Sequence, residues 1–439
     1  MLFMIPTIII SSTTFILITL SILLFPRIKI GKVVLSTYWV IALLGALILV
    51  IFNLAPINLV FNELTSESSV NPIKILILFF SMTILSIFLD EVGLFSYLAS
   101  VASAKAKNNQ FSLFVILYLL TSILTIFTSN DIVILTFTPF ICLFAKRSKV
   151  DPIPYLVGEF IAANTWSLMF IIGNPTNIYL ATSANISFFE YFKIMVFPTF
   201  CVGITEFLLL ILIFYKKLKA PLSLNNETHK IENKLGLFIG LTHLIICLIF
   251  LILSSYIPGF EMWLISLICG TSLIVFIVVL SIFKKCKFSL LKESCKKLPF
   301  QLIPFFLSMF VIVVSLKHQN ISIEISKLLN QGDMIWTYGI SSFLSSNLIN
   351  NIPMSILFSD LCMNVPTESY LKAVYASIIG SNLGAFLTPT GALAGIMFTN
   401  LVNKQKVRFT FSDFIKYGVI VSIPLLIIAL LTLNISFYF

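Results

Sequence analysis

Residues 380–394 read GSNLGAFLTPTGALA, a polar, proline-containing segment in the middle of the apolar run 371–400. A helix needs about 20 apolar residues to cross a bilayer core of about 30 Å, and this run exceeds that length. Pro389 removes a backbone donor and clashes with the preceding helical turn, and Gly391 adds conformational freedom. Non-helical backbone at membrane depth persists where protein buries it or where it lines a wet cavity. The segment therefore predicts a broken transmembrane helix.

A second apolar run, 154–185, is interrupted in the same way by Gly173-Asn174-Pro175-Thr176-Asn177. Two other runs contain polar tips and read as re-entrant hairpins. Residues 111–145 have basic residues at both ends, so both ends should lie on one side of the membrane, and the arms meet at residues 128–131. Residues 334–362 have acidic flanks and break within residues 347–353.

These elements occur twice in the same order. Residues 72–215 and 299–437 each read as span, hairpin, broken span and span. We expect one all-α polytopic membrane domain, 1–439, with inverted repeats, ten full spans and two hairpins. Residues 3–54 should form accessory helices, and 216–298 a linker with two helices. Inverted repeats with discontinuous helices are typical of secondary transporters.

The composition agrees with a membrane protein. Hydrophobic residues make up 59% of the chain and charged residues 10%, against about 25% charged in a soluble domain. This excludes a soluble enzyme, a nucleic-acid-binding domain and a disordered protein. The chain has no GxxxxGK[ST] motif, its Cys residues form no CxxC pair, and no metal-ligand cluster or cofactor site is visible. We expect no enzymatic activity.

The distribution of Lys and Arg predicts the orientation. Of the 28 basic residues, 23 fall in alternate loops, which we therefore place inside the cell. These loops are 26–32, 91–110, 146–153, 216–234, 284–298 and 401–417. With ten spans, both termini lie outside a plasma (inner) membrane that the chain crosses many times. The lipid bilayer is a partner, nucleic acid is not, and the sequence sets no oligomeric state.

Several motifs together resemble the arsenical pump membrane proteins, the ArsB-type arsenite permeases of the ion transporter superfamily. Family members are similar to LTPTGALA at residues 387–394, where they carry LTPIGSLA. The other motifs are residues 87–95, Ser129-Asn130-Asp131 with Thr138-Pro139, Asn350-Asn351-Ile352-Pro353 and residues 380–384. One segment differs from the family pattern. Residues 173–178 read GNPTNI, which resembles the wider superfamily more than the SNLVNI-like segment of many arsenite permeases.

The resemblance implies a secondary transporter that exports arsenite or antimonite, driven by a proton gradient, without a cofactor. Some family members also pair with a soluble ATPase subunit. The GNPTNI departure leaves two other activities open: a sodium/proton antiporter, and a sodium-coupled carboxylate transporter for substrates such as citrate or dicarboxylates. Sodium is then the alternative coupling ion.

Two carboxylic acids are candidates for proton coupling. Asp131 lies at the tip of the first predicted hairpin, where a charged side chain costs about 2.5–3.5 kcal/mol to insert. It can carry a proton, or it can simply cap the second hairpin arm. Glu206 lies within the apolar stretch ITEFLLL. Glu159 has the simpler interpretation of capping the start of its helix.

Neutral amides and hydroxyls at the tips and breaks are candidates for substrate binding. Arsenous acid is a small uncharged trihydroxide and needs such donors and acceptors. In the alternative interpretation these groups satisfy one another and the broken backbone. The candidates are Asn130, Asn164, Asn174, Thr176, Asn177, Asn350, Asn351, Asn382, Thr388 and Thr390. We expect Cys142, Cys201, Cys247 and Cys269 to be apolar fillers within the spans.

Overall fold

The computed structural model describes residues 3–25, 27–30, 33–66, 71–106, 109–219, 231–254, 256–257, 260–283 and 288–438. The first half contains α1 (Met4–Leu24), β1 (Arg27–Ile30), β2 (Val33–Ser36), α2 (Thr37–Ile51), α3 (Ile57–Thr65), α4 (Pro72–Glu91), α5 (Leu94–Lys105), α6 (Gln110–Phe127), α7 (Asn130–Ser148), α8 (Ile153–Trp166), η1 (Ile171–Gly173), α9 (Pro175–Ser183) and α10 (Phe188–Leu218). The second half contains α11 (Lys234–Ser254), α12 (Met262–Ile282), α13 (Phe288–Lys297), α14 (Leu302–His318), α15 (Ile321–Leu329), α16 (Met334–Ile349), α17 (Asn351–Cys362), η2 (Thr367–Ser369), α18 (Tyr370–Gly384), α19 (Leu393–Lys404) and α20 (Phe411–Ser436).

The nearly all-helical fold of a polytopic membrane protein is confirmed. Eight helical segments of the described chain are long and apolar enough to cross a membrane. This number differs from ten because each broken span forms two short helices and α2 has only 15 residues, whereas the hairpin arm α6 is long enough to be included. Residues 33–36 form β2, paired antiparallel with β1, so the predicted span 33–54 becomes helical at Thr37. The β-branched residues Val33 and Val34 favour a strand there.

Two helices meet at each predicted hairpin tip, whereas entry and exit on one side of the membrane stays a prediction. Helix α6 ends at Phe127 and α7 begins at Asn130. Helices α16 and α17 are separated by the single residue Asn350, whose φ of 70° and ψ of 153° lie in a strained region that residues other than glycine rarely adopt. The tips are therefore sharp changes of chain direction.

Both predicted breaks are present and longer than the motifs suggested. Helix α8 stops at Trp166, and α9 begins at Pro175, which fits the first turn because its missing N–H has no partner there anyway. Gly173 allows the returning chain to approach closely, since a Cβ there would lie 2.2 Å from the carbonyl oxygen of Ser167. In the second half the break runs between α18 and α19.

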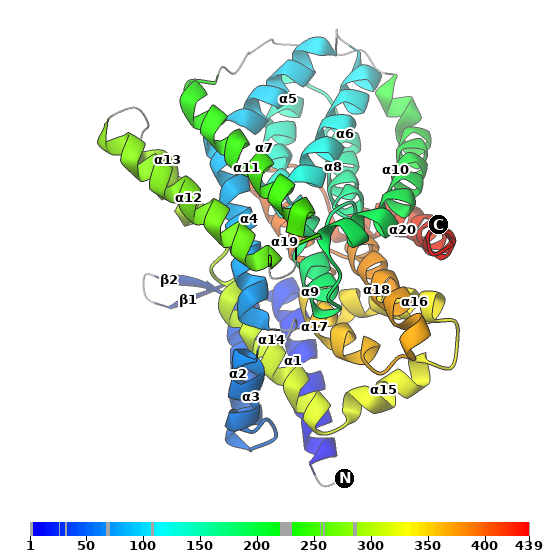
Figure 1. The fold of residues 1–439 in the computed structure, drawn as a ribbon. Helices are drawn as coiled ribbons and strands as arrows, with labels where there is room; N and C mark the ends of the chain where they lie inside the picture. The colour runs from blue at the N-terminus through cyan, green and yellow to red at the C-terminus, as the bar shows by residue number, and fades with distance from the viewer. Residues whose placement is uncertain are drawn as a thin grey trace.

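The elements of the two halves follow the same order and pack across one another. Helix α9 packs against α17, and α19 packs against α7. The pairs α1–α2 and α11–α12 occupy equivalent places, because α2 packs on α14 and α12 packs on α4. In Figure 1, α5 to α8 fill the upper part of the view and α14 to α18 the lower part, with α9 and α19 near the centre. The inverted orientation of the repeats and their bounds stay predictions.

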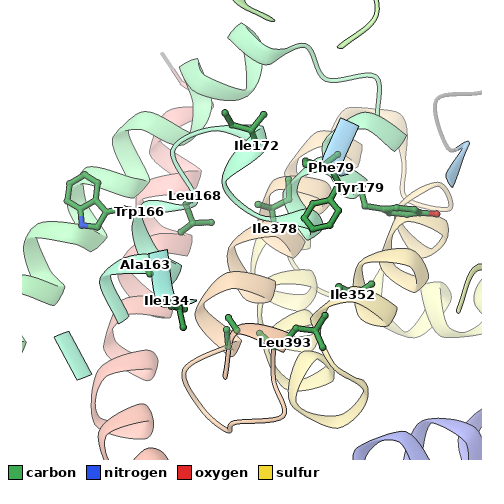
Figure 2. Packing of buried hydrophobic residues seen from close by; sticks show 14 of the residues in the cluster. Phe79, Ile134, Ala163, Trp166, Leu168, Ile172, Tyr179, Ile352, Ile378 and Leu393 are labelled. Atoms are coloured by element: carbon green, nitrogen blue, oxygen red, sulfur yellow. The ribbon is translucent and has the colours of Figure 1, made fainter. Parts of the chain in front are cut away.

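Apolar side chains from both halves surround the two breaks (Figure 2). Ile134 on α7, Leu168 after α8, Ile352 on α17, Ile378 on α18 and Leu393 on α19 belong to one buried cluster. The polar residues at the breaks are thus enclosed by hydrocarbon. A buried polar group without a hydrogen bond is costly, so the partners of these residues decide what the site can do.

Candidate functional site

Asn382 joins the two broken helices at the centre of the molecule. Its Nδ2 donates to Oδ1 of Asn177 at 2.6 Å, and its Oδ1 accepts from Nδ2 of Asn174 at 2.9 Å. Ser167 Oγ also donates to Asn382 Oδ1 at 2.9 Å. Both sides of this amide are therefore used, and no part of Asn382 is exposed to solvent. The sequence-predicted residues Asn174, Asn177 and Asn382 form one cluster.

The first hairpin tip is fastened to α8 by a second pair of amides. Asn130 Nδ2 donates to Asn164 Oδ1 at 3.0 Å, and Asn164 Nδ2 donates to the carbonyl oxygen of Phe160. Asn130 Oδ1 accepts the backbone N–H of Asp131 at 2.8 Å. Asn130 thus sets both the position of the tip and the start of α7.

The second tip is fastened to the second break. Asn350 Nδ2 donates to the carbonyl oxygen of Thr390 at 2.9 Å, and the N–H of Asn351 donates to the carbonyl oxygen of Gly391 at 3.0 Å. Thr388 Oγ1 donates to Asn347 Oδ1 at 2.7 Å and lies 2.9 Å from Thr390 Oγ1. Asn347 is a site residue that the sequence analysis did not single out. Its place in the polar run 347–353 was the available signal.

Most of these predicted substrate ligands satisfy one another, as the alternative interpretation required. Thr176 Oγ1, for example, donates to Asn174 Oδ1 at 3.2 Å. Asn351 differs: its Oδ1 is buried and has no hydrogen-bond partner among the described residues. Asn351 is therefore the amide best placed to accept a hydrogen bond from a ligand.

Asp131 follows Asn130 at the first hairpin tip and lies on the wall of a cavity of about 210 Å³. The cavity runs from the first hairpin tip, with Ser129 and Asp131, to Lys297 in a loop predicted to be cytoplasmic. Tyr38, Thr83 and Asn400 are further polar residues of its lining, and none of the predicted substrate-binding amides and hydroxyls belongs to that lining. The sequence analysis missed these lining residues because they come from separate elements.

The surroundings of the Asp131 carboxyl group suit a group that binds and releases a proton. Asp131 is in the first turn of α7, after the N-cap residue Ser129. Within the part of the chain that the structure describes, no Lys or Arg forms an ion pair with its carboxyl group. The side chain at the N-cap makes no capping hydrogen bond, and the N–H of Asp131 is taken by Asn130.

Lys297 at the other end of this cavity has acidic partners. Its Nζ lies 2.9 Å from Asp90 Oδ2 and 2.6 Å from Glu91 Oε1, at the end of α4. The side chain of Lys297 is about half exposed, at 48%. The cation is thus held by two carboxylates at the rim and does not reach Asp131 within ion-pair distance.

Glu206 on α10 is completely buried, and both of its carboxyl oxygens lack a hydrogen-bond partner among the described residues. Its polar neighbours are Tyr118 on α6 and Thr165 on α8. The hydroxyl of Tyr118 donates elsewhere, to the carbonyl oxygen of Gly203 at 2.8 Å. An unpaired buried carboxyl group in a membrane protein suggests a functional site.

The capping interpretation of Glu159 is wrong. Helix α8 begins at Ile153, so Glu159 lies in its middle, and its two carboxyl oxygens accept from Thr138 Oγ1 of α7 at 3.0 Å each. Glu159 is 3% exposed. It therefore joins the hairpin arm to the broken helix. Thr138 was part of a motif quoted from the sequence. Its contact with Glu159 could not be predicted, because the two residues lie on different helices.

The described residues contain no group of three or more His, Cys, Asp or Glu side chains placed to hold a metal ion. The polar chemistry of the two tips and breaks thus consists of amides, hydroxyls and single carboxylic acids.

Comparisons with known proteins agree with this architecture. A family profile described as citrate transporter (CitMHS) matches residues 15–380. The chain is 26% identical over 380 residues to an arsenical pump membrane protein of Escherichia coli, covering 82% of this chain and 86% of the relative. It is 25% identical over 425 residues to an arsenical pump membrane protein of Yersinia enterocolitica, covering 91% and 93%. A 46 kDa membrane protein of Mycobacterium leprae is 22% identical over 371 residues, covering 80% and 83%.

The profile covers most of the chain, and the relatives match along nearly their whole lengths. Both hairpins and the first broken helix lie within residues 15–380, whereas the second break, between α18 and α19, lies beyond the profile match. The chain therefore belongs to the citrate transporter (CitMHS) family and is a membrane transporter of the ion transporter superfamily.

Proposed function

We propose that this protein exports arsenite and antimonite across the plasma membrane in exchange for protons. The observation that carries the proposal is the Asp131 carboxyl group, which faces the cavity at a hairpin tip without an ion-pair partner among the described residues. The amides at the tips and breaks are neutral, which suits an uncharged trihydroxide such as arsenous acid. The names of the relatives from Escherichia coli and Yersinia enterocolitica support the metalloid substrate.

In this proposal the substrate enters the cavity beside Asp131 and reaches the amides beyond its lining as the repeats move, with Asn351 Oδ1 as an available acceptor. Asp131 carries the exchanged proton, and Glu206 is the second carboxyl group able to do so. Coupling requires that the protonated carrier and the unprotonated carrier differ in their affinity for the metalloid. Proton binding from outside then favours release of the metalloid outside, and movement of one repeat against the other exposes the site alternately.

A sodium-coupled carboxylate transporter, or a sodium/proton antiporter, is the second candidate. The description of the matching family as citrate transporter favours the carboxylate. A polyanion would need cationic or helix-terminal partners. The described lining of the cavity offers one cation, Lys297, and that side chain is already paired with Asp90 and Glu91. The exchange of a neutral metalloid needs no such partner.

The test uses membrane vesicles with the cytoplasmic face outward, prepared from a host that lacks its own metalloid exporter. An acidic lumen should drive arsenite accumulation, a protonophore should abolish it, and sodium should not be needed. Arsenate, a charged anion, should not accumulate. Citrate uptake or sodium exchange in parallel vesicles, with arsenite content unchanged, would assign the second candidate function. Co-expression of a soluble ATPase subunit tests for that additional partner, which should increase accumulation only in the presence of ATP.

A further inference from the structure

Three sulfur-containing residues lie on three helices that pack together: Cys247 on α11, Cys269 on α12 and Met82 on α4. Cys247 Sγ lies 3.6 Å from Met82 Sδ. Helices α11 and α12 face one another here, since His243 Nε2 lies 2.8 Å from Ser272 Oγ. Cys247 and Cys269 each lie one helical turn from these two residues, on the same facing sides. Both cysteines are free thiols.

Close helix packing holds these sulfurs together. Helices α4, α11 and α12 all pack against one another. Gly270, next to Cys269, faces α4, where a Cβ would make an ordinary contact of 3.4 Å with the Cα of Ser81. Gly240 brings α11 onto the same helix, where a Cβ would lie 2.7 Å from a methyl group of Leu89. The two thiols and the thioether therefore lie on helices whose relative position is fixed by packing.

One of the three sulfur residues, Cys269, lines a second cavity. A cavity of about 450 Å³ lies between α11 and α12, and Cys269, His243 and Ser272 are part of its mostly apolar lining. Cys269 is 7% exposed, and Cys247 behind it is fully buried. None of the residues that line the Asp131 cavity lines this one. A ligand at the sulfurs would thus be bound outside the proposed transport path.

We propose that Cys247 and Cys269 form a dithiol site for a trivalent metalloid hydroxide, with the Met82 thioether as a soft neighbouring contact. Each thiol replaces one hydroxyl group of the metalloid: two sulfur–arsenic bonds form, two arsenic–oxygen bonds break, and the two thiol protons leave with the hydroxyls as two water molecules. Arsenic stays trivalent, so no oxidant or reductant is needed. The product keeps one hydroxyl group and is neutral.

Neutrality is the reason for choosing a metalloid over a soft cation. Thiols and thioethers also bind monovalent copper or silver. A cation would have to cross an apolar cavity wall, which is costly, whereas an uncharged trihydroxide carries no net charge into it. The choice of metalloid rests on the proposed function, but the dithiol chemistry rests on the sulfur geometry alone.

The experiment measures arsenic retained by the purified, detergent-solubilised full-length protein after incubation with arsenite and gel filtration. Variants Cys247→Ser and Cys269→Ser each leave one thiol and nearly the same shape. Cys201→Ser is the matched control, since Cys201 lies on α10 in a similar apolar span, outside the lining of this cavity. Met82→Leu tests the thioether, and the thermal unfolding midpoint of every variant reports folding.

The wild type and Cys201→Ser should bind arsenic in equal amounts. Cys247→Ser and Cys269→Ser should each bind about 100-fold more weakly, because a second bond to the same atom acts as a linked binding event. Met82→Leu should retain most of the binding. Unchanged binding in both single-thiol variants, or an equal loss in Cys201→Ser, would overturn the proposal. Binding of silver, with no binding of arsenite, would overturn the metalloid assignment.

The vesicle assay separates this site from the transport proposal. Cys247→Ser should export arsenite at the wild-type rate, because the sulfurs lie outside the transport cavity. Dithiol-dependent binding in a protein that exports no arsenite would contradict the proposed function and leave this site standing. Arsenite export without dithiol-dependent binding would contradict the dithiol site and leave the proposed function standing.

Discussion

Asn382 on α18 donates a 2.6 Å hydrogen bond to Oδ1 of Asn177 on α9, and this bond ties the break in one repeat to the break in the other. The same amide accepts from Asn174 and Ser167. All four side chains are buried, so each hydrogen bond replaces one that water would have made. Any movement of one broken helix against the other must therefore rearrange this cluster.

Replacement of Asn382 by Leu should destabilise the protein strongly. It would leave Asn177 Oδ1 and Asn174 Nδ2 without the partner that they share, and each unsatisfied buried group costs about 1–3 kcal/mol. We expect a lower thermal unfolding midpoint in detergent. Ser381→Ala is the adjacent control, because Ser381 Oγ is buried and has no hydrogen-bond partner among the described residues, so its removal should change the midpoint little. Equal midpoints for Asn382→Leu and Ser381→Ala would contradict this prediction.

Asp131→Asn tests proton coupling. The variant keeps the size of the side chain and a hydrogen-bonding amide but can no longer exchange a proton. We expect loss of arsenite accumulation driven by a pH gradient, with downhill exchange of arsenite preserved. If Asp131 only caps α7, Asn caps comparably well and gradient-driven flux should survive. Normal flux would transfer the coupling role to Glu206, which Glu206→Gln would then test in the same vesicles.

Thr138→Val should destabilise the contact between α7 and α8. It removes the hydroxyl that donates to both oxygens of Glu159 and leaves that buried carboxyl group unpaired, at a cost of about 1–3 kcal/mol. Thr138→Ser keeps the hydroxyl and should restore the midpoint. The measurement is thermal unfolding of the two variants beside the double variant Thr138→Val with Glu159→Leu. A double variant as unstable as Thr138→Val would show that the pairing is not the cause.

Gly391→Ala should disturb the second hairpin tip. A Cβ at Gly391 would lie 2.7 Å from Asn347 Oδ1 and 2.9 Å from the carbonyl oxygen of Gly384. The overlap should cost about 1–3 kcal/mol and weaken the Thr388–Asn347 hydrogen bond. We expect slower transport and a lower unfolding midpoint. Gly270→Ala, where the nearest atom is at an ordinary 3.4 Å, is the control and should behave as wild type.

The orientation of the first hairpin can be measured by labelling of single cysteines in a cysteine-free background. Lys105 and Lys149 are exposed on either side of α6 and α7, and Lys327 is exposed on α15. Lys105→Cys and Lys149→Cys should both react with an impermeant thiol reagent from the cytoplasmic face, and Lys327→Cys from the outer face. Reaction of the first two from opposite faces would rule out the re-entrant hairpin and the inverted repeat.

The sequence by itself determined where the helices cross, turn and break. Apolar runs, Pro175 and Pro389, and the polar tips at residues 128–131 and 347–353 all act within a few residues of chain, because helix formation, capping and proline strain are local effects. The predicted hairpin tips and breaks are accordingly present, whereas lengths were less accurate: residues 33–36 pair as a strand, and α8 stops at Trp166.

Only the tertiary structure decided which side chains meet. Asn382 donates to Asn177, which lies 205 residues away in the chain. Glu159 accepts from Thr138 on the neighbouring helix, and Cys247 contacts Met82 on a third. The sequence placed Asn351 and Asn382 in one group of polar candidates. In the structure, Asn351 Oδ1 has no hydrogen-bond partner among the described residues, whereas the amide of Asn382 has partners for both its oxygen and its nitrogen. The difference arises because a buried hydrogen bond depends on the position and rotation of two packed helices, which no local pattern specifies.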